Sequence, residues 1–436
     1  MSANNVESQE SHWPLRVVVL IFVGLLTYGS YFAYDSVGAL APTLIQAWNT
    51  SQSGIGWLYT IYSIAAILSV FVGGVLTDRI GTRWASLVFS LLIVIGAGMV
   101  ALSSSVPVAC LGRFVFGAGS ESLVVAQNAI LARWFTGRML AMSFGVTLAL
   151  ARLGTLFSFN TMSLTANRYG WRGALWVAAG LCVASLGANI VYYLLDKTNE
   201  RRLGLAETEA GDKIVLADIK KFGASYWYVV ALCVTFYSAI FPFTALSTDF
   251  FHEKWQLPLS VDSGTQSFIA AAFQDFLHMF STAPGTSSII IFASMCFAPF
   301  AGGVVDKIGR RTSLMIVGAL LMIPCYLLLA FTAIAPALPM ILLGAAFVLV
   351  PAAMWPAVPL IVEKNRVGTA FGLMTMVQNI GLAAFPLLNG WLREWTKDYR
   401  ASMVMFALLG CAGLVFAFLL KRADTAAGGV LEQSQS

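Results

Sequence analysis

Three charged residues lie in stretches that are otherwise apolar enough to cross a lipid bilayer. Arg113 and Glu121 belong to the run GRFVFGAGSE, and Arg152 belongs to the run LARLG. An ionisable side chain in the hydrocarbon region costs several kcal/mol, roughly 2.5 to 3.5 on insertion scales, so it persists where it is paired or lines a polar cavity. Because polar cavities inside helical membrane proteins carry solutes, these residues predict a transport site.

Glu121 and Arg152 are expected at the same depth of the membrane. Counted from Val106, Glu121 lies about 22 Å into its span at a rise of about 1.5 Å per residue, and Arg152 lies near the middle of the next span. The two could form a structural salt bridge, a proton-coupling pair in which Glu121 changes charge, or a clamp for substrate. We favour the clamp, since a guanidinium binds a carboxylate bidentately and a zwitterion offers each residue a partner.

Polar and aromatic side chains within apolar runs complete the candidate substrate site. In the first span, Tyr31 and Asp35 share one face of the helix by their spacing of four. The second half of the chain carries no Arg, Lys or Glu at mid-membrane depth, so the charged groups of the substrate should bind the first half. The second half then supplies walls and hinges, for which the candidates are Tyr237, Trp355, Gln378 and Asn379.

The composition requires a membrane. With 58% hydrophobic and 11% charged residues and a mean hydropathy of +0.79, the chain has too few polar groups to cover a soluble protein of 436 residues. Helical spans of about 20 apolar residues cross a hydrocarbon core. We predict an all-α membrane protein with 12 transmembrane helices, near 16–46, 54–77, 84–103, 106–133, 139–165, 172–195, 226–250, 285–305, 312–333, 337–362, 367–392 and 400–420.

The charges between the spans predict the orientation and the domains. Most of the 26 Lys and Arg residues fall on the side of the two termini, which makes both termini cytoplasmic by the positive-inside rule. The predicted parts are a disordered arm 1–15, a first six-helix bundle 16–195, a cytoplasmic linker 196–225, a second six-helix bundle 226–420 and a tail 421–436.

One loop element occurs twice. GGVLTDRIGTR follows the second span and GGVVDKIGRR follows the eighth, as in two parallel repeats. Each copy places a carboxylate at the negative end of its own helix dipole, where it needs a compensating partner. A contact made in one conformation and broken in another would be a latch; the alternative is an insertion signal with a tight turn. The latch candidates are Gly74, Asp78, Arg79, Gly81, Arg83, Gly302, Asp306, Lys307 and Gly309, with Arg113 as a further structural or proton-relay residue.

Other site classes find no support in the sequence. The six cysteines fall in or beside predicted spans without a CxxC pair, and the three histidines are scattered, so we expect no disulfide framework, metal or cofactor. The net charge of +5 follows from topology and does not indicate nucleic-acid binding. Catalytic motifs such as HExxH and GxSxG are missing, so we do not expect an enzyme.

Two segments stay ambiguous at this level. KIVLADIKKF in the linker is either a short amphipathic helix at the membrane surface or a solvated stretch. Residues 256–284 either begin the eighth span early and break at Pro284, or lie on the outer surface. Periodicity alone cannot decide between these alternatives.

The repeated loop resembles the signature of the major facilitator superfamily. Longer runs resemble the lysosomal dipeptide uniporters of that superfamily and their prokaryotic relatives, at 112–128, 134–137, 150–154, 240–255 and 353–383. The resemblance implies two pseudosymmetric six-helix bundles that rock about a central cavity. It also implies that Glu121 binds the amino end of a dipeptide and Arg152 its carboxylate, with Trp355 as a wall.

The function expected from these observations is facilitated diffusion of dipeptides or short peptides by alternating access. The alternative is a proton-coupled symporter or antiporter of small organic anions, with Arg152 binding the anion. The resemblance further implies a single-span accessory subunit as a possible partner, besides the lipid bilayer. The short amino-terminal arm shows no clear lysosomal sorting signal, so we expect a plasma membrane or a bacterial inner membrane.

Overall fold

The computed structural model describes residues 13–135, 138–203, 219, 221–261, 267–363 and 366–433, and in this part the regular structure is helical. Ten of its helices are long and apolar enough to cross a bilayer. The helices are α2 (Trp13–Ala39), α3 (Ala41–Ala47), α4 (Gln52–Leu102), α5 (Val106–Trp134), α6 (Arg138–Leu203), α7 (Ala224–Trp255), α8 (Phe268–Leu277), α9 (Ala283–Ile308), α10 (Arg311–Phe331), α11 (Ala337–Met354), α12 (Val358–Ile361), α13 (Val367–Thr396) and α14 (Arg400–Ala426), with 3₁₀ turns η2 (Trp355–Ala357) and η4 (Val430–Glu432).

Two of the ten helices each supply two spans. α4 has 51 residues and α6 has 66, which at about 1.5 Å per residue is more than twice the thickness of a hydrocarbon core. Each is interrupted by one glycine with a left-handed φ, Gly81 at 78° and Gly170 at 72°, a conformation that glycine adopts without steric cost. Within the described residues this gives twelve spanning segments, which confirms the prediction of 12 transmembrane helices.

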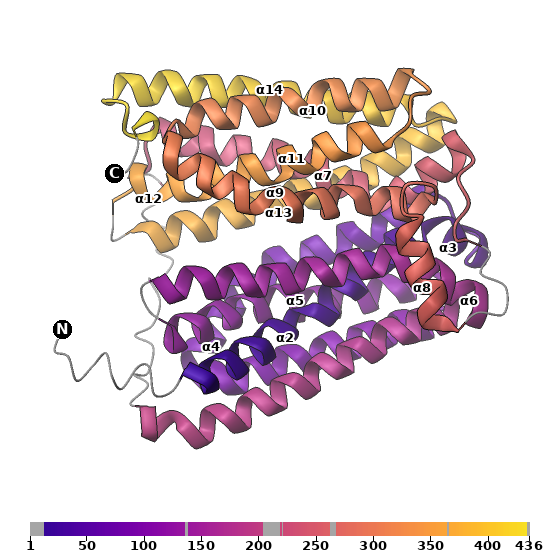
Figure 1. The fold of residues 1–436 in the computed structure, drawn as a ribbon, viewed down its shortest axis with the longest axis horizontal. Helices are drawn as coiled ribbons and strands as arrows, with labels where there is room; N and C mark the ends of the chain where they lie inside the picture. The colour runs from indigo at the N-terminus through magenta and orange to yellow at the C-terminus, as the bar shows by residue number, and fades with distance from the viewer. Residues whose placement is uncertain are drawn as a thin grey trace.

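The helices form two groups that follow the chain (Figure 1). α2 to α6 pack together, and α7 and α9 to α14 form the second group, with the boundary between α6 and α7. Both repeated loops turn at a glycine with a positive φ, Gly81 at 78° within α4 and Gly309 at 73° at the end of α9, although their ψ angles of 155° and -25° differ. We refer to these groups below as the first and second bundle.

Hydrogen bonds join the bundles at the end of the molecule away from both termini. Gln52 Nε2 donates to Asp249 Oδ2 at 3.1 Å, and the backbone N–H of Ser53 donates to Glu394 Oε1 at 2.7 Å. Thr60 Oγ1 donates to the carbonyl of Ala383. Toward the termini the ribbons of α4 and α5 diverge from those of α12 and α13 (Figure 1). The bundles are therefore fastened to each other at one end.

The structure refines three predicted elements. The first span is broken after α2 and continues as α3. The tenth is α11, the 3₁₀ turn η2 and α12, because Pro356 and Pro359 lack the N–H groups that a continuous helix needs. In the segment 256–284, α8 is a helix of its own, and Pro284 stands in the first turn of α9, where proline fits.

α6 continues to Leu203, beyond residue 196 at which the linker is predicted to start. Asp196 is fully buried and holds the ends of three spanning segments together. Its carboxylate pairs with Arg83 of α4 and with Arg133 of α5 at 3.0 Å, and it accepts a hydrogen bond from Trp134 Nε1 at 2.6 Å. Of the linker alternatives, most of 213–222 lies outside the described residues, as does the arm before Trp13.

We expect Asp196→Asn to destabilise the first bundle. The substitution leaves the Arg83 and Arg133 guanidinium groups facing an uncharged amide, and breaking a buried ion pair from one side costs about 3 to 5 kcal/mol. The measurement is the apparent Tm of the detergent-purified protein, which should fall by several degrees. Asp398→Asn is the matched control, because its pair with Arg400 is 3.8 Å long and exposed. Equal Tm values for the two variants would contradict this role of Asp196.

Candidate functional site

Glu121 lies near the middle of α5 and faces α4. A Cβ atom on Gly117 would lie 2.7 Å from the carbonyl oxygen of Tyr62, so the glycine lets the two helices approach closely. This approach brings the Tyr62 hydroxyl to Glu121, where it donates a hydrogen bond to Oε1 at 2.7 Å. The Glu121 side chain is only partly buried. The Tyr62 hydroxyl therefore holds the Oε1 atom of Glu121, and the second carboxylate oxygen can accept a hydrogen bond from another donor.

Arg152 reaches from the first bundle to the second. Arg152 stands two residues before Gly154, at which α6 approaches α2 closely. A Cβ atom on Gly154 would lie 2.5 Å from the carbonyl oxygen of Tyr28. The guanidinium carbon lies 4.0 Å from the ring centroid of Phe347 on α11, which is a cation–π contact across the bundle boundary. Among the described residues, the guanidinium makes no hydrogen bond. Its N–H edge is therefore available.

The structure does not pair Glu121 with Arg152: no ion pair joins them in the part of the chain that it describes. Instead, Tyr31 lies within electrostatic range of Glu121, Arg152 and Asp35 together. Asp35 is buried and accepts a hydrogen bond from Thr155 Oγ1 at 2.6 Å. Tyr31 and Asp35 thus lie one turn apart on α2, and Asp35 contacts α6 three residues after Arg152.

Four aromatic rings of the second bundle continue from Arg152 toward η2, and we call them the aromatic series. Phe347 meets Phe241 edge to face at 5.5 Å, and Phe241 stacks on Tyr237 at 5.8 Å with an interplanar angle of 11°. The Trp355 indole N–H then donates to the Tyr237 hydroxyl at 3.0 Å. The predicted residues Tyr237 and Trp355 are therefore in direct contact and are linked to Arg152.

The two predicted amides of α13 have different surroundings. Gln378 Oε1 lies 3.5 Å from the Cys233 thiol, which donates to it from α7 one turn before Tyr237. Asn379 is buried, and its Nδ2 donates to the carbonyl of Thr375 in its own helix at 3.1 Å. The structure thus brings Gln378 toward the aromatic series and directs Asn379 into the packing of the second bundle.

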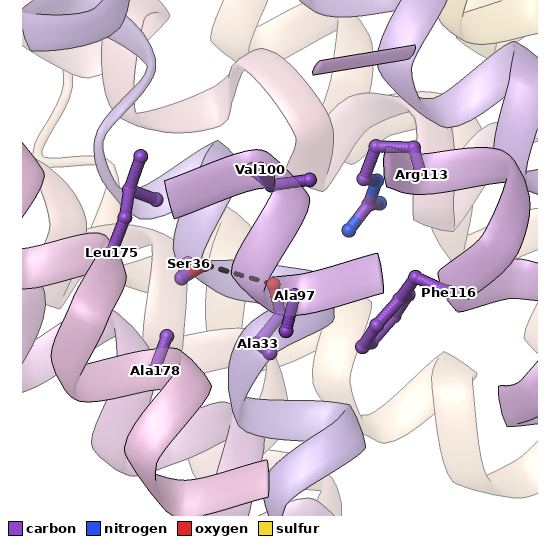
Figure 2. A pocket seen from close by; sticks show the side chains of 8 residues that line it. All are labelled: Ala33, Ser36, Ala97, Val100, Arg113, Phe116, Leu175 and Ala178. Atoms are coloured by element: carbon purple, nitrogen blue, oxygen red, sulfur yellow. Dashed lines mark hydrogen bonds between the residues drawn. The ribbon is translucent and has the colours of Figure 1, made fainter. Parts of the chain in front are cut away.

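Arg113 lies buried inside the first bundle, beside the Tyr62 ring whose hydroxyl bonds Glu121. Its guanidinium carbon lies 4.9 to 5.4 Å from the ring centroids of Tyr34, Tyr59, Tyr62 and Phe116, and its N–H groups donate to the carbonyls of Leu58 and Tyr34. Beside it lies a cavity of about 10 Å³, which Ser36 and Ala97 also line, and Figure 2 shows the lining side chains. This volume holds about one water molecule, so it is no substrate site.

The latch candidates occupy the end of the molecule near the termini. Asp78 and Arg79 are exposed at the end of the first span of α4, before Gly81, and Arg83 pairs with Asp196. A Cβ atom on Gly73 would lie 2.5 Å from Ser122 Oγ, whereas Gly74 has open space, so Gly73 makes the close helix contact. In the second copy, Lys307 is exposed and Gly309 caps α9. The surroundings of Gly302 and of the Asp306 side chain are not among those that the structure describes.

Sequence reasoning missed the partners that position the charged residues. Tyr62 is one of several aromatic residues in its apolar run, Phe347 stands alone in its own, and nothing in their spacing marks them as neighbours of Glu121 and Arg152. Asp196 was assigned to a linker because it stands at the polar end of a span. A search for acids that follow a span by less than one turn would have found it.

A family model of the Major Facilitator Superfamily matches residues 20–283 and 259–435 of the chain. The chain belongs to the major facilitator superfamily. It is therefore a multi-pass membrane protein and a secondary transporter, and not an enzyme, as predicted.

Sequence relatives cover nearly the whole chain. It is 34% identical over 426 residues to the lysosomal dipeptide transporter MFSD1 of Danio rerio, covering 94% of this chain and 87% of the relative. The human MFSD1 protein is 32% identical, with 96% and 88% covered. A hexuronate transporter of Bacillus subtilis is 23% identical over 402 residues, with 89% and 91% covered. The resemblance to the dipeptide transporters is therefore confirmed.

Solved structures share the fold. A bacterial homologue of the human lysosomal transporter Spinster, in an inward-facing and occupied conformation, superposes with a TM-score of 0.72 at 15% identity and covers 97% of this chain and 99% of that one. A variant of the peptide transporter POT gives a TM-score of 0.72 at 14% identity, with 95% of each chain covered. At these identities the likeness supports the two-bundle fold alone.

Proposed function

We propose that this transporter moves dipeptides by facilitated diffusion and binds their two charged ends between Glu121 and Arg152. The observation that carries the proposal is the unpaired state of these two residues. Each is held by an aromatic neighbour, Tyr62 for Glu121 and Phe347 for Arg152, and neither is neutralised by the other. Opposite charges at mid-membrane depth that do not pair with each other are suited to a ligand that carries both complementary charges.

The chemistry of each end fits a zwitterion. A guanidinium presents parallel N–H donors to a carboxylate, and a carboxylate accepts charge-assisted hydrogen bonds from an ammonium group. An extended chain spans about 3.3 to 3.6 Å per residue, so a dipeptide places its charged ends about 7 Å apart. That separation requires two residues that face one ligand without pairing with each other, as Glu121 and Arg152 do.

The second bundle supplies a mostly uncharged wall. The aromatic series runs from Phe347 to Trp355, and Gln378 contacts Cys233, one turn before Tyr237 on α7. Aromatic faces accept apolar and aromatic side chains alike, so this wall suits ligands whose ends are constant and whose side chains vary. The MFSD1 relatives, which are named dipeptide transporters, support the same substrate class.

Alternating access fits the way the bundles meet. Gln52 and Ser53 tie the first bundle to Asp249 and Glu394 of the second at the end away from the termini. With both termini in the cytoplasm, as the charges between spans predict, this fastened end is the outer one and the structure faces inward. Asp78 and Asp306, at the other end, would engage their partners when the bundles rock to the outward-facing state.

A second candidate is the proton-coupled transport of a small organic anion, which the similarity to a hexuronate transporter favours. In that case Arg152 binds the anion, and Asp35 or Glu121 takes up the proton. Uptake into proteoliposomes with an imposed pH gradient separates the two candidates. Facilitated diffusion of a neutral dipeptide stops at equal concentrations on both sides, whereas proton coupling drives accumulation above the external concentration.

We expect Glu121→Gln and Arg152→Lys each to abolish the thermal stabilisation that dipeptides confer on the detergent-purified protein. Each change removes a charge-assisted or bidentate interaction worth about 1.5 to 3 kcal/mol, which corresponds to roughly a 10- to 150-fold loss of affinity. The Tm without ligand should stay near that of the unmodified protein. Normal stabilisation of both variants by dipeptides would show that the two residues do not bind the substrate.

We expect Phe347→Leu to weaken dipeptide binding by roughly 2- to 30-fold, because it removes a cation–π contact worth about 0.5 to 2 kcal/mol that orients the Arg152 guanidinium. Isothermal titration with a dipeptide measures the Kd. Phe347→Tyr should bind normally, since it keeps the aromatic ring. Phe331→Leu, at a position on α10 that is 64% exposed, is the control for the substitution itself. An unchanged Kd for Phe347→Leu would show that Phe347 does not orient Arg152 for dipeptide binding.

A further inference from the structure

α8 does not run alongside the spanning helices. Figure 1 shows it crossing their ends at a steep angle, at the end of the molecule away from the termini, between α9 of the second bundle and α6 of the first. The helix begins with a side-chain cap, since Ser267 Oγ accepts a hydrogen bond from the N–H of Ala270. Its axis thus lies close to the plane of the membrane surface rather than along the membrane normal.

One face of α8 is fixed to the protein. Ala271 is fully buried, and Asp275, one turn later, is buried and accepts a hydrogen bond from the backbone N–H of Val261 at 2.8 Å. Phe276 meets Phe292 of α9 edge to face at 6.1 Å. On the other bundle, the Arg168 guanidinium lies 5.9 Å from the ring of Phe268. These contacts set the rotation of the helix about its axis.

The opposite face carries an apolar stripe without a protein partner in the described residues. Ile269, Phe273 and Leu277, at spacings of four, are 81%, 61% and 58% exposed, and Phe280 in the following turn is 48% exposed. No charged residue interrupts the stripe, and Gln274 and His278 lie on its flank. A helix with one apolar and one anchored face is typical of a membrane interface.

The bilayer is the occupant that the surroundings favour. The neighbouring spans also expose large apolar side chains, with Phe157 of α6 48% exposed and Phe297 of α9 39% exposed. The helix also lies across the ends of the spans, where a bilayer that surrounds them would have its surface (Figure 1). We propose that α8 binds the lipid surface on this side of the membrane through Ile269, Phe273 and Leu277, with its axis parallel to the surface.

Spin labels test this proposal independently of what the protein transports. Cys296→Ala and Cys411→Ala remove the two exposed thiols among the described cysteines. Single cysteines then replace Phe273 or Leu277 on the stripe, and Gln274 or His278 on the flank as matched controls. The purified, labelled protein is reconstituted into phosphatidylcholine vesicles, and the collision rates of each label with oxygen and with a water-soluble nickel chelate are measured.

We expect the ratio of the oxygen rate to the nickel rate to be several-fold higher at positions 273 and 277 than at 274 and 278, because oxygen concentrates in lipid and the chelate in water. Similar ratios at all four positions, with nickel reaching the stripe freely, would overturn the proposal. That result would instead assign the stripe to a protein partner, which purified vesicles lack. Each label position is exposed or partly exposed, and the Tm of each variant verifies folding.

Discussion

The proposed transport depends on one feature of the first bundle. The Glu121 carboxylate and the Arg152 guanidinium lie within spanning helices and do not pair with each other. Charge is expensive in the hydrocarbon region unless it is paired or hydrated. Here the protein supplies partial compensation only: the Tyr62 hydroxyl donates to Glu121, and the face of the Phe347 ring lies against Arg152. The remaining stabilisation is left to water or to a ligand, which is what a binding site for a zwitterion requires.

The compensating groups also connect the site to the parts that move. Phe347 belongs to the second bundle, so under the proposed alternating access its contact with Arg152 would change as the bundles rock. From Phe347, the aromatic series leads to Trp355 in the turn between α11 and α12, where prolines interrupt the helix. Arg152 thus contacts the first of a continuous row of rings that ends at the proline-containing turn η2 of the second bundle.

Much of this arrangement could be predicted from the sequence, because the bilayer fixes helix lengths and penalises charge. The apolar runs predict the twelve spans, and the breaks between these runs predict the bends at Gly81 and Gly170. Glu121, Arg152 and Tyr31 stand out because they are polar residues inside apolar runs. The contact of Arg152 with Phe347 could not be predicted from the sequence. It joins two bundles, and the way in which two bundles pack against each other produces no periodic pattern of residues in the sequence. The orientation of Asn379 was equally hidden, because a buried amide that bonds its own helix has the same sequence signal as one that faces a ligand.

The most direct measurement of the central claim is a binding cycle that removes each charge from the ligand and from the protein in turn. A dipeptide, its N-acetyl form and its carboxyl amide are titrated into the unmodified transporter, Glu121→Gln and Arg152→Lys. The account predicts that acetylation weakens binding to the unmodified protein strongly but to Glu121→Gln little, and that amidation behaves in the same way toward Arg152→Lys. If acetylation and amidation cost the same affinity in all three proteins, the charged ends are recognised elsewhere and the account is wrong.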